Sequence, residues 1–306
     1  MEERIYDIII IGGGPAGYSA ALYASRAGLD TLVIERMSAG GQMALTDMID
    51  NYPGFENGVD GFELGMKMQQ GAQRFGAKTE YGEVVGVDLE GAVKSVSTAS
   101  KIFYGRTVVI ATGANPRELG VENESKLLGR GVHYCAHCDG RFYKDKTVIV
   151  VGGGNSAVSD ALYLSRIVKK VYLVHRRDAL RATRIYHEPL MKAENVEFVW
   201  NSRVAEIHES NGRVGGVTVL DVNDGNKRRI DCDGLFISIG RQPVTAFLRD
   251  SVKLDAQGYI VADETTKTDI DGVYAVGDVR TKVLRQVVTA VSDGAVAVHY
   301  AEEYLG

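Results

Sequence analysis

Two stretches of this sequence align without a gap. Residues 8–37 read IIIIGGGPAGYSAALYASRAGLDTLVIERM, and residues 148–177 read VIVVGGGNSAVSDALYLSRIVKKVYLVHRR. Each has an apolar strand pattern, a Gly-x-Gly-x-x-Gly/Ala turn, a stretch of helical period and a second apolar strand pattern. Such a turn brings backbone N–H groups and a helix N-terminus to a pyrophosphate. The repeat predicts an α/β fold with two Rossmann-like dinucleotide-binding domains, whose turns contain Gly12, Gly14 and Gly17, and Gly152, Gly154 and Ala157.

The two copies differ at the position that meets the ribose. A Rossmann unit usually has an acidic residue about 20 residues after its first glycine. The first copy has Glu35 there, which suits an unphosphorylated ribose, as in the adenosine half of FAD or NAD. The second copy has His175, followed by Arg176, Arg177 and then Arg181, and guanidinium groups bind a 2′-phosphate. The second site is therefore expected to take NADPH; the plainer alternative is that this segment only begins a solvated helix.

Composition places the chain among globular proteins of about two domains. It has 306 residues, of which 45% are hydrophobic and 25% charged, and a net charge of -5. This charge argues against general nucleic-acid binding. The charged N-terminal residues do not resemble a targeting segment, and no stretch approaches the ~20 apolar residues of a membrane span. With only three cysteines there is no secreted disulfide framework. We expect a cytoplasmic protein that binds neither nucleic acid nor membrane.

The order of segments predicts that one domain is inserted into the other. Apolar strands that end in glycine close at residues 107–113 and 234–240, and each is followed by a Pro-containing segment typical of a domain boundary. The tail holds another strand and turn at residues 271–278, which need a sheet to join. The alternative, a tail that belongs to the second domain, fits the closing Gly240 less well. The expected order is an FAD domain at 1–114, an inserted NADPH domain at 115–241, and the rest of the FAD domain at 242–306.

A Cys-x-x-Cys pair, Cys135 and Cys138, lies just before the second repeat. Two thiols at this spacing can form a redox disulfide, and nearby cations lower the pKa of such a thiol. Asp139 follows directly, and an acid there can carry the proton that dithiol exchange requires. His137, between the thiols, either stabilises a thiolate as imidazolium or is an exposed residue without a role.

Zinc binding is the competing interpretation of the cysteine pair. Cys135 and Cys138 with His133 or His137 supply three local ligands at most, whereas a closed structural site has four. Cys232 is far away in the sequence and in a strand-like context, so a passive thiol is expected there. A redox pair is favoured, and no metal site is expected.

The chain resembles the low-molecular-weight, bacterial-type thioredoxin reductases along essentially its whole length. The resemblance rests on these motifs: Gly12 to Gly17, Gly40-Gly41-Gln42, Asn51-Tyr52-Pro53-Gly54-Phe55, Cys135 to Gly140, Gly152 to Ala157, His175-Arg176-Arg177 with Arg181, Gly277-Asp278, and Arg285-Gln286. It implies a homodimeric flavoprotein that passes electrons from NADPH through FAD and a Cys135–Cys138 dithiol to thioredoxin. It also implies that Cys138 faces the flavin, that Cys135 attacks the partner disulfide, and that the domains rotate between half-reactions.

The resemblance also implies a set of site residues. Cys135, Cys138 and Asp139 are expected to be catalytic. The residues expected at FAD are Gly12, Gly14, Pro15, Ala16, Gly17, Glu35, Arg36, Gly41, Gln42, Thr46, Asn51, Val84, Ala111, Thr112, Gly113, Gly277, Asp278, Arg285, Gln286 and Val287. Those expected at NADPH are Gly154, Asn155, Ser156, Ala157, His175, Arg176, Arg177 and Arg181.

Two positions depart from the family pattern, and two other functions compete. His137 stands where the family commonly has threonine, and Ser159-Asp160 replaces a frequent Glu-Glu. A related flavin reductase that serves another small redox protein or a peroxide-reducing system is the nearer alternative. A non-catalytic nucleotide sensor is the more distant one, because a sensor does not need a Cys-x-x-Cys-Asp motif beside a nicotinamide site.

Overall fold

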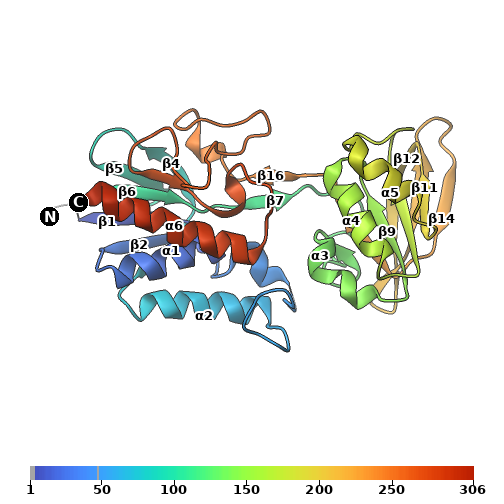
Figure 1. Cartoon of the computed structure of the whole chain (residues 1–306), viewed down its shortest axis with the longest axis horizontal. Coiled ribbons are helices and arrows are strands. Elements are labelled where there is room, and N and C mark those ends of the chain that lie inside the picture. Colours follow the sequence, from blue (N-terminus) through green and yellow to red (C-terminus); the bar gives the residue numbers. More distant parts are fainter. Residues whose placement is uncertain (1–3, 47) are drawn as a thin grey trace. The chain divides into compact units, whose positions relative to one another are not determined.

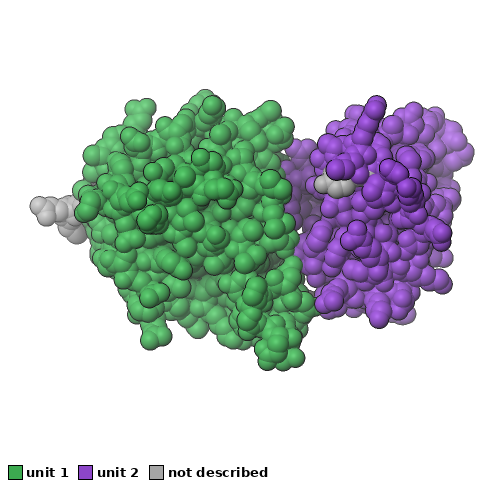
Figure 2. All heavy atoms as spheres, in the orientation of Figure 1, with its two compact units in different colours: residues 1–115, 242–306 green, residues 116–241 purple. Residues whose placement is uncertain are grey.

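The computed structural model describes residues 4–46 and 48–306, which form two compact units (Figure 1). One unit contains Met1–Asn115 together with Gln242–Gly306, and the other contains Pro116–Arg241 (Figure 2). Each unit has its own sheet with glycine turns at the ends of its strands, as the repeat predicted. The expected α/β class with two dinucleotide-binding folds is confirmed.

The first unit is built on a mixed sheet in the order β3-β2-β1-β6-β5-β4. Its strands are β1 (Ile5–Ile11), β2 (Thr31–Glu35), β3 (Lys78–Tyr81), β4 (Val84–Asp88), β5 (Lys94–Thr98), β6 (Ile102–Ile110) and β17 (Val273–Ala275). The first three strands and β6 run parallel, whereas β4 and β5 are antiparallel additions. The long strand β6 pairs with β5 along its first half and, in parallel, with β17 along its second half. The C-terminal segment thus completes the sheet begun by the N-terminal one.

Both faces of this sheet are buried, because neighbouring residues of a strand point to opposite faces. Ile8 and Ile10 pack against the helices α1 (Pro15–Arg26), α2 (Gly61–Gln73) and α6 (Val287–Leu305). Ile9 and Ile11 face the segment around Leu248, which includes the turn η4 (Ala246–Leu248). The short helical turns η1 (Gly41–Leu45) and η5 (Gly277–Val279) border the sheet. No helix in the described residues is long and apolar enough to cross a membrane.

The second unit has a parallel sheet in the order β11-β10-β9-β15-β8. Its strands are β8 (Val132–His133), β9 (Thr147–Val151), β10 (Lys170–Val174), β11 (Val196–Val199) and β15 (Gly234–Ile237). One face packs on α4 (Asn155–Ser165) and α5 (His187–Met191). The other face is covered by an antiparallel sheet of β12 (Ser202–Ser210), β13 (Arg213–Asp221) and β14 (Lys227–Ile230). The remaining helical elements are α3 (Ala136–Asp139), η2 (Gly140–Tyr143) and η3 (Arg184–Tyr186).

The chain passes between the units twice, through two short strands that pair with one another. These are β7 (Ala114–Pro116) and β16 (Arg241–Pro243). Just before β7, the hydroxyl of Thr112 donates to the carbonyl oxygen of Val244 at 2.7 Å, and the amide of Val244 donates to Gly113 at 3.0 Å. The two crossings are therefore tied together by hydrogen bonds.

Candidate active site

The first glycine turn leads into α1 and leaves its backbone donors open. Gly14 is the N-cap of α1, and no described side chain bonds to the first N–H groups of the helix. A Cβ on Gly12 would lie 2.5 Å from the carbonyl oxygen of Ala111, and one on Gly17 would lie 1.9 Å from that of Gly12. A Cβ on Gly14 would meet no described atom within 4 Å, so this glycine faces open space. Since the first N–H groups of a helix lack intrahelical partners, this cradle fits a pyrophosphate.

Glu35 ends β2 directly beside this turn. Its carboxylate accepts from the amide of Gly13 at 2.6 Å and from that of Met37 at 2.9 Å, and the residue is 9% exposed. The carboxylate orientation is thereby held by one hydrogen bond on each oxygen. An ionised carboxylate has about four lone-pair sites, so two remain for ribose hydroxyls. Arg36, in contrast, is exposed and lies 4.0 Å from Glu83.

Amide side chains join the segments that were expected to line the flavin. The amide of Gln42 donates to the Asn115 side chain, and that of Asn51 donates to the Gln286 side chain, both at 3.0 Å. Gln286 is also the N-cap of α6. The carbonyl oxygen of Thr46 accepts from Gly61 at 3.0 Å. Residues far apart in the sequence are thus held together in the first unit.

A buried ion cluster holds the loop that contains Gly277 and Asp278. Asp293 on α6 accepts from the amide of Gly277 at 2.8 Å and from the guanidinium of Arg280 at 2.9 Å. Lys282 approaches the same carboxylate at 2.8 Å. Burial alone would raise the pKa of Asp293, but the hydrogen bonds from Arg280 and Lys282 outweigh it and lower the pKa.

Arg285 supports this loop from another side. Its guanidinium lies over the ring of Tyr259, 4.2 Å from the centroid, and donates to the carbonyl oxygens of Lys282 and Arg280. The side chain therefore fixes the path of the loop into Gln286 and α6.

The second glycine turn repeats the geometry of the first. Gly152 has a φ of +143°, and a Cβ there would lie 2.4 Å from the carbonyl oxygen of Ser238. Gly154 is the N-cap of α4, again with no described side-chain cap and no described atom within 4 Å of its Cβ position. Asn155 accepts from the amide of Thr183 at 2.8 Å, which leaves its NH₂ group for another acceptor. A second pyrophosphate fits here for the same physical reason.

His175 differs from its counterpart Glu35. Its ring is buried under Gly153, where a Cβ would lie 2.4 Å from Nε2, and Nε2 has no hydrogen-bond partner in the described residues. Burial and the charges of Arg181 and Arg177 lower the pKa of His175, which favours the neutral imidazole. The imidazole therefore packs against the glycine turn, and its neutral form adds no charge there.

The arginines after β10 lie at the surface. Arg176, Arg177 and Arg181 are all exposed. The backbone amide of Arg181 donates to the carbonyl oxygen of Gly153 at 2.7 Å, which ties the arginine segment to the glycine turn. The three arginines therefore lie on segments that border the second glycine turn.

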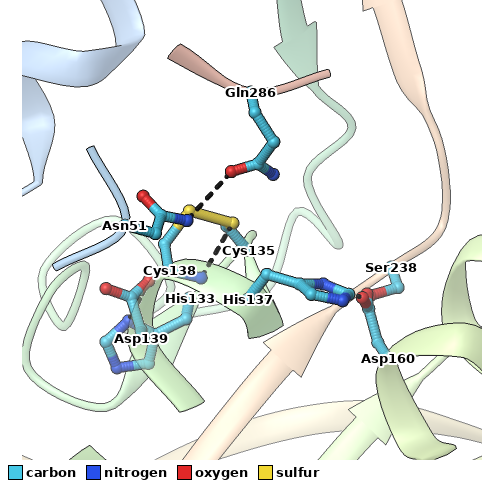
Figure 3. Close-up of a disulfide and its surroundings, with 9 residues drawn as sticks. All are labelled: Asn51, His133, Cys135, His137, Cys138, Asp139, Asp160, Ser238 and Gln286. Atoms are coloured by element: carbon cyan, nitrogen blue, oxygen red, sulfur yellow. Dashed lines mark hydrogen bonds and ion pairs between the residues drawn. A yellow bond between two sulfur atoms is a disulfide. The ribbon is translucent and has the colours of Figure 1, made fainter. Parts of the chain in front are cut away.

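Cys135 and Cys138 form a disulfide at the start of α3 (Figure 3). Their Cα atoms are 5.3 Å apart, and Sγ of Cys135, the N-cap residue, accepts from the amide of Cys138 at 3.2 Å. Both cysteines are partly exposed, as a pair that exchanges with an external disulfide must be.

Asp139 ends α3 and pairs with a buried histidine. Its Oδ2 lies 3.0 Å from Nδ1 of His133, which is 7% exposed. Nε2 of His133 lies 2.7 Å from the hydroxyl of Tyr143, which is 2% exposed. The imidazole stacks on Phe236, with centroids 5.2 Å apart, because β8 and β15 place the two residues side by side. Burial raises the pKa of Tyr143 to about 12, although Arg213 opposes the shift.

His137 points away from Asp139 and packs on α4 (Figure 3). Its ring stacks on Tyr163 at 4.3 Å between centroids, and Nδ1 lies 3.7 Å from Oδ1 of Asp160. The other oxygen of Asp160 accepts from the hydroxyl of Ser238 at 2.5 Å. The two positions at which this chain departs from the family pattern, His137 and Asp160, therefore contact one another.

The third cysteine, Cys232, is buried in the core of the second unit. Burial raises the pKa of its thiol to about 12. Cys232 is a packed thiol, as the sequence predicted.

Comparisons with known proteins agree with this geometry. Residues 6–294 match the model of the pyridine nucleotide-disulphide oxidoreductase family. Thioredoxin reductase from Listeria monocytogenes is 49% identical over 99% of this chain and 95% of its own length. The chain belongs to the thioredoxin reductase family.

Two further relatives extend the similarity. Thioredoxin reductase from Bacillus subtilis is 48% identical over 99% of this chain and 96% of its own length. The crystal structure of thioredoxin reductase from Streptococcus pyogenes has a TM-score of 0.92 at 44% identity and covers 98% of both chains. The similarity to these relatives covers residues of both units.

Sequence reasoning missed the contacts of His133. The sequence suggested His133 only as a zinc ligand, whereas in the structure it bridges Asp139 and Tyr143. No spacing motif connects these three residues, because the bridge forms only when β8 pairs with β15 and η2 folds back. Val132 and His133 form the two-residue strand β8 and are both buried, so no alternation in the sequence marks His133 as buried.

Proposed function

We propose that this chain catalyses the NADPH-dependent reduction of thioredoxin, with electrons passing through FAD and the Cys135–Cys138 disulfide. One observation carries the proposal: this disulfide and an uncapped dinucleotide turn lie in the same compact unit of a thioredoxin reductase fold. The net reaction joins NADPH, one proton and a disulfide to give NADP⁺ and a dithiol. A reductase for another small redox protein is the alternative, and the relatives do not favour it.

The FAD domain is assigned to residues 1–114 and 242–306, all of which belong to the first unit. The N–H groups of α1 and the glycines at 12, 14 and 17 would bind the pyrophosphate, and Glu35 would accept from the ribose. The segments joined by Asn51 and Gln286, and the loop at Gly277-Asp278, would hold the rest of the cofactor. FAD, when bound, supplies the two-electron carrier between the nicotinamide and the disulfide.

Residues 115–241 are the proposed NADPH domain. The start of α4 would bind the pyrophosphate, with Asn155 beside it, and the arginines at 176, 177 and 181 would bind the 2′-phosphate. His175 would hold the glycine turn in place, since its ring packs against Gly153. A carboxylate in this place would instead repel a 2′-phosphate, which explains why the two copies diverged at this position.

The dithiol carries the electrons to the partner protein. Cys135, as thiolate, would attack the partner disulfide and form a mixed disulfide, and Cys138 would then displace the partner by attacking Cys135. The family resemblance assigns Cys138 to the side that faces the flavin. Asp139, next to Cys138, would take and return the proton that these steps move.

Rotation of one unit against the other is part of the proposal. The nicotinamide and the dithiol are both assigned to residues 115–241, so they cannot both face the flavin at once. Rotation at the paired strands β7 and β16 would alternate them. The proposal also includes a homodimer formed mainly through the FAD domains, on the family resemblance, and a cytoplasmic location, on the sequence composition.

Anaerobic titration of the purified protein with NADPH, and separately with NADH, tests this function. We expect bound flavin, a preference for NADPH and an uptake of four electrons per chain, two for the flavin and two for the disulfide. The reduced protein mixed with oxidised thioredoxin should then release free thioredoxin thiols. Flavin reduction by NADPH without any thioredoxin thiols would favour the alternative acceptor.

A further inference from the structure

A continuous polar chain runs from the active-site carboxylate into the core of the second unit. It consists of Asp139, His133 and Tyr143, joined by contacts of 3.0 Å and 2.7 Å (Figure 3 shows the first two residues). His133 and Tyr143 are 7% and 2% exposed, so water does not satisfy their polar atoms. The other groups that face the chain are Arg213 and Asp233, which both act on Tyr143.

Every polar atom of the imidazole is used in this arrangement. When Asp139 is ionised, Nδ1–H of neutral His133 donates to the carboxylate, and Nε2 accepts from the hydroxyl of Tyr143. When Asp139 carries a proton, the carboxyl donates to Nδ1, and Nε2–H donates to the phenol oxygen. Burial raises the pKa of Tyr143 to about 12, so the phenol stays protonated and can serve in both arrangements. Both imidazole nitrogens therefore have a partner in two states, which differ by one proton at Asp139 and by the tautomer of His133.

We propose that His133, held by Tyr143, is a positioning residue that controls the proton of the Asp139 carboxyl during dithiol–disulfide exchange. The inference deepens the proposed function and rests on it. His133 touches neither a sulfur nor a substrate in this assignment; it acts through Asp139. The imidazole orients one carboxylate oxygen through the contact of 3.0 Å. In the proposed step, the second oxygen would take the proton of the thiol.

The proposed step balances. In the mixed disulfide, the thiol of Cys138 gives its proton to the Asp139 carboxylate while its sulfur attacks Sγ of Cys135. The Cys135–Cys138 bond forms as the bond from Cys135 to the partner's cysteine breaks. The expelled partner thiolate then takes the proton from Asp139, so that the carboxylate and its hydrogen bond from His133 are restored.

His133→Phe removes the donor and keeps a ring of similar size against Phe236. The ionised carboxylate then loses the hydrogen bond on one oxygen, so the acidic limb of the pH–rate profile for thioredoxin reduction should move to higher pH. The maximal rate should fall on the order of tenfold, part of the ~10²–10⁴ typical of proton-transfer groups. The change should appear in kcat more than in the KM for thioredoxin.

Three further variants separate the proton role from packing. His133→Asn keeps an N–H donor and should return the limb toward its wild-type position. Tyr143→Phe removes only the hydroxyl that pairs with Nε2 of His133, and should move the limb in the same direction by less. Tyr134→Phe is the matched control: Tyr134 adjoins Cys135 but bonds to Glu124 at 2.8 Å, so its loss should leave the limb in place.

A second readout does not depend on thioredoxin or on bound cofactors. Protein reduced with dithiothreitol is alkylated with iodoacetamide across a pH series, and cysteine modification is followed by mass spectrometry. The pH of half-maximal alkylation should be higher in His133→Phe than in the wild type. If the wild type does not reduce thioredoxin, the proposed function fails, while the alkylation series still tests His133.

Two results would overturn the inference. One is a pH profile of His133→Phe that coincides with that of the wild type in both measurements, whatever its rate. The other is an equal displacement in Tyr134→Phe, which would show that any loss of packing near the disulfide moves the limb. Thermal midpoints and flavin content of each variant identify a misfolded protein, and His133→Asn then decides the question.

Discussion

Replacement of Arg176, Arg177 and Arg181 together by glutamine should abolish the preference for NADPH over NADH. All three arginines are exposed, so each phosphate contact is taken at the lower end of the range for charge-assisted hydrogen bonds, about 1.5 kcal/mol. Three such contacts amount to about 4.5 kcal/mol, which corresponds to roughly 10³ in kcat/KM. If only two of them reach the phosphate, the loss is on the order of 10². The NADH value should change by less than about threefold, because NADH has no 2′-phosphate.

The assay is the reduction of ferricyanide with either coenzyme, which does not require the cysteines. Arg228→Gln is the control, since Arg228 is exposed in the same unit on β14, away from the glycine turn. A wild-type protein that uses NADH as well as NADPH would refute the phosphate assignment. An equal loss with both coenzymes would show instead that the arginines support the fold of the turn, to which the backbone of Arg181 is bonded.

Three further outcomes are expected. The purified protein should carry about one FAD per chain, and a colourless protein that takes up no flavin on reconstitution would contradict the assignment of the first unit. Cys135→Ser and Cys138→Ser should each abolish thioredoxin reduction, while NADPH still reduces the flavin in stopped-flow measurements. Asp139→Asn should slow turnover by ~10²–10⁴-fold. Near-normal turnover of Cys135→Ser would exclude the dithiol relay. Asp293→Asn should lower the free energy of unfolding by about 3–5 kcal/mol at pH 7, because it leaves Arg280 buried without its carboxylate. The pKa of Asp293 is lower in the folded protein than in the unfolded chain, so the stability that its carboxylate adds is fully present above the unfolded-state pKa and is lost as the pH falls through the folded-state pKa. The free energies of unfolding of variant and wild type, measured by urea melts, should therefore converge in acid. A constant difference between them down to pH 2 would contradict this.

The glycine repeat made the two dinucleotide folds predictable, because a turn such as Gly152 tolerates no Cβ against Ser238 and so leaves a strict sequence pattern. The antiparallel strands β4, β5 and β12 to β14 were not predicted. They cover or extend the sheets with ordinary alternating residues, and nothing in their spacing specifies a partner. The cysteine pair was evident from its spacing. The partner of Asp139 was not, because His133 reaches it only through tertiary structure, and the contact of His137 with Asp160 likewise depends on how α3 packs on α4.

The split of the first unit also constrains the order in which the chain can fold. Strand β6 is made early, but β17 and α6, which complete its sheet and cover it, leave the ribosome last. The inserted residues have their own sheet and core, and can fold while the rest is still being made. Once they have folded, the pairing of β7 with β16 brings Asn115 and Gln242 together. If residues 116–241 were a flexible loop, closing it would cost about 4 kcal/mol of conformational entropy. Because the insert is already folded, this cost has been met before the last helix docks. Folding of the inserted unit thus brings together the two chain segments that form the first unit.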